Sequence, residues 1–174
     1  MRKPPSRPRP ASLPALKLTQ ARATIPVVGG AVTTDFLHAF RADAMERVRI
    51  VKGGVPAGVI DTMAKRMGMP KEKLIVTLGL ARATIDRKAR DSKPLSPDEG
   101  SKVLGMARLV GQVQAMVEES GEPAGFDAAG WLASWLDRPL SALGGQRPAE
   151  LMDTAEGQGL VSQLVARMQS GAYS

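Results

Sequence analysis

The segment that decides the fold is residues 131–174, WLASWLDRPLSALGGQRPAELMDTAEGQGLVSQLVARMQSGAYS. Its last part repeats apolar residues every three or four positions, which is typical of an amphipathic helix. Both tryptophans of the chain belong to a second apolar stripe, and we expect them in a small core, with a binding hot spot as the alternative. Pro148 suits the first turn of a short helix, and Gly157 is expected to break the chain before the last helix. The two stripes are Trp131, Leu132, Trp135 and Leu136, then Leu160, Val161, Leu164, Val165 and Met168.

Several short motifs follow one another in this segment. They are a Trp-Leu pair, then Pro139, Leu140, Leu143 and Gly144, then Arg147-Pro148-x-Glu150-Leu151, Thr154 with Gly157, and a terminal helix closing on Gly171-Ala172-Tyr173. In this order and spacing the segment resembles the toxin-binding domain of Xre/MbcA/ParS antitoxins. The resemblance spans roughly residues 50–174 and leaves the first fifty unmatched.

The resemblance implies a function and partners. Members of this family are antitoxins of type II modules, paired with a RES-domain toxin that degrades NAD. They form dimers, hold the toxin in a larger complex and commonly repress their own operon. The expected partners are therefore a RES-domain toxin encoded by the adjacent gene, operator DNA and a second copy of the chain. The family's C-terminal segment lies near the toxin's active site, so the expected toxin contacts are Arg167, Met168, Gln169, Tyr173 and Ser174; alternatively, Tyr173 packs back on its own domain.

Composition favours an all-α fold. The chain has 174 residues, 43% of them hydrophobic, which suffices for one domain or two small ones. It has three Phe, two Trp and one Tyr, so its core must consist mainly of Leu, Val, Met and Ala, as in packed helices. No stretch approaches the roughly 18 apolar residues of a membrane span, and cysteine is absent. We therefore expect a cytoplasmic protein that does not enter membranes.

Catalytic motifs are missing from the sequence. It has no cysteine, no phosphate-binding glycine loop and no histidine-rich metal pattern. His38 is the single histidine, and we expect it to be a surface or packing residue. The chain is therefore predicted not to be an enzyme and to need no cofactor.

Charge divides the chain into regions. Residues 1–22 hold six bases and no acid, and residues 65–93 hold nine bases and three acids. Residues 118–160 reverse the sign, with eight acids and two bases. This contrast indicates a polyanionic partner for the basic region and a protein partner for the acidic one, although each cluster taken singly could be a solvated face. The predicted division is a flexible, basic, Pro-rich arm (1–33), a helix-turn-helix domain (34–95), a connecting helix (96–120) and a toxin-binding domain (121–174).

Short helices separated by glycine turns predict the helix-turn-helix. One helix is expected from Phe36 to about Gly53, capped by Thr34-Asp35, and others at 56–67, 71–78 and 81–89. The last is basic, and its pattern resembles the recognition helix of Xre-type repressors, apart from Ala81 where a capping Ser is usual. Long donors and short hydroxyls suit the major groove. The predicted DNA-binding residues are Arg82, Thr84, Arg87, Lys88 and Arg90.

Two alternatives remain for this region. Residues 60–74 form a second acceptable helix-turn-helix register, which would place Lys71 and Lys73 at the DNA. We favour the later register because its last helix is more basic. The fold could also have lost DNA binding and serve as a scaffold.

A clear start signal precedes the predicted connecting helix. Ser96, Pro97 and Glu99 provide the N-cap, the first helical residue and the return hydrogen bond of a capping box. The helix should run to about Glu118, and its wide apolar stripe could join the two halves or form a dimer seam, with Gly105 and Gly111 allowing close approach. The competing function is a stand-alone helix-turn-helix regulator without a toxin, in which the C-terminal half only dimerises.

Overall fold

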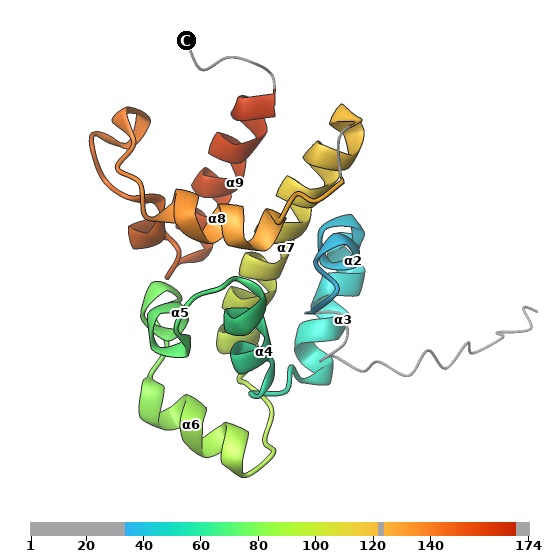
Figure 1. Ribbon diagram of the computed structural model, residues 1–174. Helices are drawn as coiled ribbons and strands as arrows, with labels where there is room; N and C mark the ends of the chain where they lie inside the picture. The colour runs from blue at the N-terminus through green and yellow to red at the C-terminus, as the bar shows by residue number, and fades with distance from the viewer. Residues whose placement is uncertain (1–33, 122–123, 170–174) are drawn as a thin grey trace, which may run out of the picture.

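The computed structural model describes residues 34–121 and 124–169, and these residues form helices joined by turns, without a strand (Figure 1). The predicted all-α class is confirmed. The order is α2 (Phe36–Arg41), α3 (Ala44–Gly53), α4 (Val59–Arg66), α5 (Lys71–Thr77), α6 (Arg82–Arg90), α7 (Pro97–Ser120), α8 (Ala128–Leu136), the 3-10 helices η1 (Ser141–Leu143) and η2 (Pro148–Leu151), and α9 (Ala155–Gln169).

Helix α7 is the axis of the molecule. Its predicted capping box is present: the Ser96 hydroxyl accepts from the Glu99 amide at 3.2 Å, and the Glu99 carboxylate accepts from the Ser96 amide at 2.7 Å. Gly121, with φ 87°, ends the helix in the left-handed conformation. Helices α2 and α3 pack on one side of α7, and α8 and α9 pack on another (Figure 1). The buried stripe includes Val103, Leu104, Met106, Ala107, Val110 and Val113, as the sequence predicted.

The prediction of one helix from Phe36 to Gly53 is wrong, because the chain breaks at Ala42 and Asp43. Ala42 has an extended ψ of 136°, and the Asp43 carboxylate accepts from the Glu46 amide at 2.7 Å, which starts α3 as a new helix. The break lets α2 lie along α7. A Cβ on Gly111 would lie 1.9 Å from the Phe36 carbonyl oxygen, so this glycine allows the close approach.

Helices α4, α5 and α6 form the helix-turn-helix region. The apolar stripes of α4 and α5 are buried, and they comprise Val59, Ile60, Met63, Ala64, Leu74 and Ile75. Gly68 and Gly79 adopt φ values of 62° and 60° in the two turns, which suit glycine. The Leu95 amide donates to the Val55 carbonyl at 2.7 Å and returns the chain to the start of this region.

The C-terminal unit surrounds α8 and α9. Asp127 caps α8, because its carboxylate accepts from the Gly130 amide at 3.0 Å. Gly157 was expected to break the chain before the last helix, but it lies within α9, which begins at Ala155. Because glycine has no side chain, the Leu151 carbonyl oxygen fits beside it, 1.8 Å from where a Cβ would lie. Leu160 also departs from prediction, because it is 51% exposed while Val161 and Val165 are buried.

Candidate functional site

Helix α6 stands at the edge of the molecule, on the side away from α8 and α9 (Figure 1). Only Ile85 of this helix is buried, so most of its surface is available to a partner. No side chain caps its start at Ala81, in agreement with the missing Ser noted in the sequence. The helix therefore presents a basic surface supported by one apolar anchor.

The five predicted DNA-binding residues have different surroundings. Arg87 and Arg90 are exposed, and no ion pair or hydrogen bond of their side chains is found within the described residues. Arg82 is 64% exposed and lies 3.1 Å from Glu72 and 3.6 Å from Asp86. Thr84 is half-buried.

Lys88 points toward α7 instead of solvent. Its side chain is 19% exposed, and its ammonium donates to the carboxylate of Glu99, the residue that completes the capping box of α7. Burial alone would raise the pKa of Glu99, but the bonds from Lys88 and the Ser96 amide outweigh it, and the pKa lies below its ordinary value. Lys88 thus joins the end of α6 to the start of α7.

The competing helix-turn-helix register places α5 in the role of recognition helix. Its two predicted contacts, Lys71 and Lys73, are both engaged: Lys71 bonds to Asp86 at 2.8 Å, and Lys73 pairs with Asp137 of the C-terminal unit. The same bond from Lys71 is the main cause that lowers the pKa of Asp86. Because α5 also packs against η2, the geometry favours α6 as the exposed helix.

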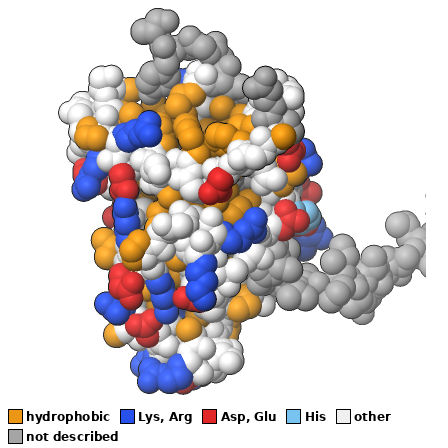
Figure 2. Space-filling model, viewed as in Figure 1, with side chains coloured by type: hydrophobic (Ala, Val, Ile, Leu, Met, Phe, Trp, Pro, Cys, Tyr) orange, Lys and Arg blue, Asp and Glu red, His pale blue; other side chains and the backbone are white. Residues whose placement is uncertain are grey.

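The C-terminal unit has a small core and an apolar face. Trp135 is 5% exposed and stacks on Trp131 at a centroid distance of 6.0 Å, so Trp135 fills the core as expected while Trp131 is only half-buried. Figure 2 shows hydrophobic side chains gathered on the face that carries α8 and the end of α9. We use the term apolar face for this surface and assign to it Trp131, Leu140, Leu143 and Met168, which are among the half-buried residues of the unit that pack against the core.

The five predicted toxin contacts lie at or beyond the end of α9. Arg167 is exposed and Met168 is half-buried. Gln169 is the last residue of the helix. The side chain of Gln169, and Tyr173 and Ser174 as a whole, lie outside the described residues.

The C-terminal unit contacts both the turn between α5 and α6 and the helix α7. A Cβ on Gly79, in the turn between α5 and α6, would lie 2.7 Å from the Cβ of Asp153. The amide of Gln158 on α9 donates to the carbonyls of Lys102 and Met152, at 3.1 and 2.9 Å. Gln112 of α7 and Ser162 of α9 exchange two further bonds. Sequence reasoning missed all of these residues, because their partners are distant in the chain.

Throughout residues 34–121 and 124–169, no helix combines the length and apolar character needed to cross a membrane. The same part of the chain holds no group of three or more metal-ligating side chains.

A helix-turn-helix unit joined by a long helix to a smaller helical unit defines a two-domain regulator of the DNA-binding type. The Antitoxin Xre-like helix-turn-helix domain matches residues 46–108, and the Antitoxin Xre/MbcA/ParS C-terminal toxin-binding domain matches residues 124–171. The chain belongs to the Xre/MbcA/ParS family of antitoxins.

Individual antitoxins resemble the chain over most of its length. It is 44% identical over 135 residues to the Prs ADP-ribosylating antitoxin of Sphingobium sp. (strain YBL2), which covers 78% of this chain and 85% of that protein. It is 25% identical over 124 residues to the antitoxin Xre of Yersinia enterocolitica, covering 71% and 78% of the two chains. The antitoxin Xre of Photorhabdus laumondii is 21% identical over 125 residues, covering 72% and 79%.

The chain is therefore the antitoxin of a toxin–antitoxin system. Its C-terminal domain implies a toxin partner, and its helix-turn-helix domain implies DNA binding. Both domains belong to non-enzymatic regulatory proteins, so the chain is not an enzyme. A stand-alone regulator loses its support, because the half that would only dimerise matches a toxin-binding domain.

Proposed function

We propose that this antitoxin neutralises a RES-type toxin that consumes NAD, and that it represses its own operon. The observation that carries the proposal is the match of the C-terminal unit to a toxin-binding domain. A relative named Prs ADP-ribosylating antitoxin supports the choice of toxin, because ADP-ribosylation consumes NAD and we assign that activity to the toxin. We propose that both activities take place in the cytoplasm.

Neutralisation is proposed to be steric. A toxin that uses NAD needs a cleft, and a helix end with a short tail can fill such a cleft while an apolar surface anchors on its rim. Here the apolar face would be the anchor, and residues 167–174 would enter the cleft. Arg167, Gln169, Tyr173 and Ser174 would supply polar contacts, and Met168 belongs both to the anchor and to the entering segment.

The experiment that tests this proposal is co-expression with the product of the adjacent reading frame. We expect the two proteins to co-purify, and the neighbour's NAD consumption to stop in the presence of the antitoxin. Removal of residues 170–174 should restore NAD consumption while the complex still co-purifies through the apolar face. Full inhibition by the shortened chain would contradict the steric mechanism, and a neighbour that leaves NAD untouched would contradict the choice of toxin.

A matched pair of variants distinguishes binding through the apolar face from occlusion of the toxin's cleft by residues 167–174. Leu140→Ser removes apolar surface from a half-buried position of the apolar face and leaves residues 167–174 intact. We expect it to weaken co-purification, because apolar surface at an interface contributes to affinity roughly in proportion to the area buried. Ser134→Ala, at an exposed position of α8 outside the apolar face, is the control and should co-purify normally.

Autorepression is proposed to act through α6. The exposed Arg82, Arg87 and Arg90 suit phosphates and guanine edges, and Thr84 lies on the same helix. A homodimer would place two copies of α6 on successive major grooves of a palindromic operator. Gel-shift titration with the antitoxin's own upstream DNA tests this, and light scattering tests the dimer; binding that is insensitive to salt would contradict phosphate contact.

A further inference from the structure

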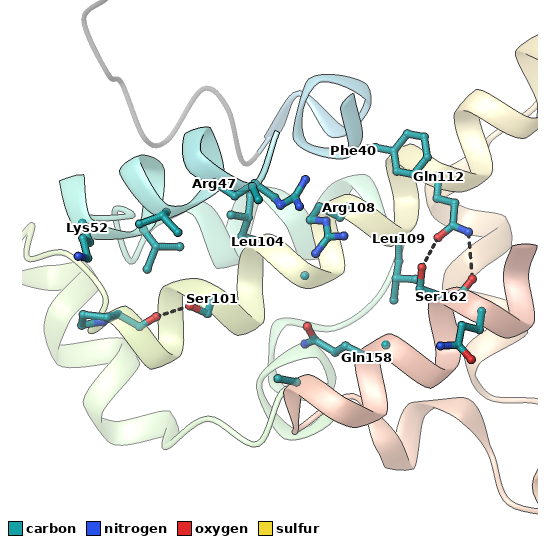
Figure 3. A pocket seen from close by; sticks show the side chains of 18 residues that line it. Phe40, Arg47, Lys52, Ser101, Leu104, Arg108, Leu109, Gln112, Gln158 and Ser162 are labelled. Atoms are coloured by element: carbon teal, nitrogen blue, oxygen red, sulfur yellow. Dashed lines mark hydrogen bonds between the residues drawn. The ribbon is translucent and has the colours of Figure 1, made fainter. Parts of the chain in front are cut away.

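A cavity of about 670 Å³ lies between α3, α7 and the first half of α9, with Phe40 of α2 on its wall (Figure 3). No residue of α6, and no residue of α9 beyond Gln163, is among those that line it. Its size is in the range of small-ligand sites, roughly 300–1,000 Å³. The cavity is thus separate from both surfaces of the proposed function.

The charged residues that line the described part of the cavity are all basic. Arg47, Lys52 and Arg108 line it, and no acidic residue of the described chain does. Arg47 and Arg108 extend from α3 and α7 into the same part of the cavity (Figure 3). Burial lowers the pKa of Arg108, and the charge of Arg47 lowers it further. Two guanidinium groups therefore lie close together without a neutralising carboxylate.

Arg47 donates a hydrogen bond to the Ala42 carbonyl, whereas one donor atom of Arg108 has no partner among the described residues. The atom without a partner is the buried Nε. A buried donor without a partner costs free energy, more when it is charged. Gln112 of α7 and Ser162 of α9 bond to each other, at 2.8 and 3.0 Å, and not to Arg108. A bound anion would supply the missing acceptor.

Part of the wall is apolar and open to solvent, although Ser101, Gln158 and Gln163 also line the cavity. Phe40 is 37% exposed and Val48 is 45% exposed, while Leu104 is buried beneath them. Such a wall suits the hydrocarbon part of a ligand, in the way that small-molecule sites combine apolar walls with a few convergent polar groups.

We propose that this cavity binds a small organic anion, whose carboxylate or phosphate group is held by Arg47 and Arg108 while its apolar part packs on Phe40, Val48 and Leu104. Charge complementarity selects this occupant over a second copy of the chain. A two-fold contact through the cavity would bring both pairs of arginines together, and no acidic residue lines the described part of the cavity to neutralise them. The site gives the antitoxin a means of responding to a metabolite that is neither its toxin nor its DNA.

The test is a calorimetric titration of the full-length chain with four probes below their micelle concentrations. They are octyl phosphate, octanoate, the neutral octyl glucoside and inorganic phosphate. At least one of the two organic anions should bind at least about tenfold more tightly than octyl glucoside and than inorganic phosphate, because charge and apolar contact are both needed. Equal binding of octyl glucoside, tightest binding of inorganic phosphate, or no binding at all would overturn the proposal.

Two variants locate the binding. Arg108→Met removes the charge and keeps roughly the length of the side chain. It should lower the affinity for the organic anion at least about tenfold. The melting temperature of the ligand-free protein should stay unchanged or rise, because the unpaired buried charge is gone. Gly159→Leu should block the cavity, since a side chain at this lining position meets open space. Ala166→Leu adds the same group at an exposed position of α9 outside the cavity and should bind like the wild type.

A second copy in the cavity is the competing outcome. Light scattering of the wild type and of Gly159→Leu distinguishes it. A wild-type dimer that Gly159→Leu dissociates, with no probe bound by either protein, would overturn the ligand site. Anion binding that Gly159→Leu abolishes, with an unchanged oligomeric state, supports it.

Discussion

Arg87 and Lys88 are neighbours in the sequence with opposite surroundings in the structure. Arg87 is exposed on α6, and Lys88 is bonded to Glu99 at the start of α7. We expect Arg87→Ala to weaken operator binding by about 1–3 kcal/mol if it reads a base, and to leave the melting temperature unchanged. Gel-shift titration and thermal melting measure the two effects.

The control for this prediction is Arg49→Ala. Arg49 is an exposed arginine on α3, remote in sequence from α6, and it carries the same charge. It should reduce DNA affinity much less than Arg87→Ala does. If the two variants lose the same affinity, only net charge matters, and α6 is not the reading helix.

The Lys88–Glu99 pair predicts a pH-dependent stability. The pKa of Glu99 lies below its ordinary value of 4.5 in the folded state, so its ion pair stabilises the fold above that value and is lost as pH falls through the folded pKa. Glu99→Gln should lower the free energy of unfolding by about 1–3 kcal/mol at pH 7. The difference from wild type should shrink as the pH falls below about 4.5. Urea unfolding at several pH values tests this.

Asp98→Asn is the matched control for Glu99→Gln. Asp98 occupies the same first turn of α7, but its side chain is 77% exposed in its pair with Lys102. Its loss should lower stability by less than about 1 kcal/mol, because solvent screens an exposed pair. An equal loss in the two variants would show that helix-end charge alone explains both.

At the scale of elements, the two glycines Gly111 and Gly159 lie in different surroundings. A methyl group on Gly111 would meet the backbone of α2 at 1.9 Å, whereas one on Gly159 meets open space. Gly111→Ala should destabilise the fold by about 1–3 kcal/mol or more, since α2 must move off α7. Gly159→Ala should stabilise it by about 0.5–1 kcal/mol, because alanine favours the helix. Thermal melting measures both, and a neutral Gly111→Ala would show that α2 does not pack on α7.

Local signals in the sequence were sufficient to place most helices. Ser96 and Asp35 each cap the helix that the sequence assigned to them, because a capping side chain bonds to an amide only three residues away. The break between α2 and α3 has the same kind of signal at Asp43, but the apolar spacing continues across it and hid the break. Gly157 was misread because a glycine that ends a helix and one that admits a neighbouring carbonyl look alike in sequence.

The site was less predictable than the helices. The sequence showed which residues of α6 are basic, but not that Lys88 is bonded to α7 while Arg87 is exposed. Arg47 and Arg108 are 61 positions apart in the sequence, so their shared cavity could not be recognised before the fold was known. Pairing at such distances depends on how whole helices pack, which no local pattern specifies.

At the scale of the whole molecule, the two halves share α7. The helix packs against α2 and α3 of the first half and against α8 and α9 of the second. Lys73 pairs with Asp137 across the halves, and Gly79 lies against Asp153. A unit of about fifty residues such as 124–171 would be only marginally stable alone, because a small domain buries a small fraction of its surface. The two halves should therefore unfold together.

The distribution of tryptophan allows a direct test. Both tryptophans lie in α8, so fluorescence reports on the C-terminal half alone, whereas far-UV circular dichroism reports on every helix. We expect the two signals to give the same urea midpoint, because α7 couples the halves. Separate midpoints would contradict the shared core. They would also mean that a toxin bound to the C-terminal half has no route through α7 to the DNA-binding half, since coupling between sites needs an element whose state both of them bias.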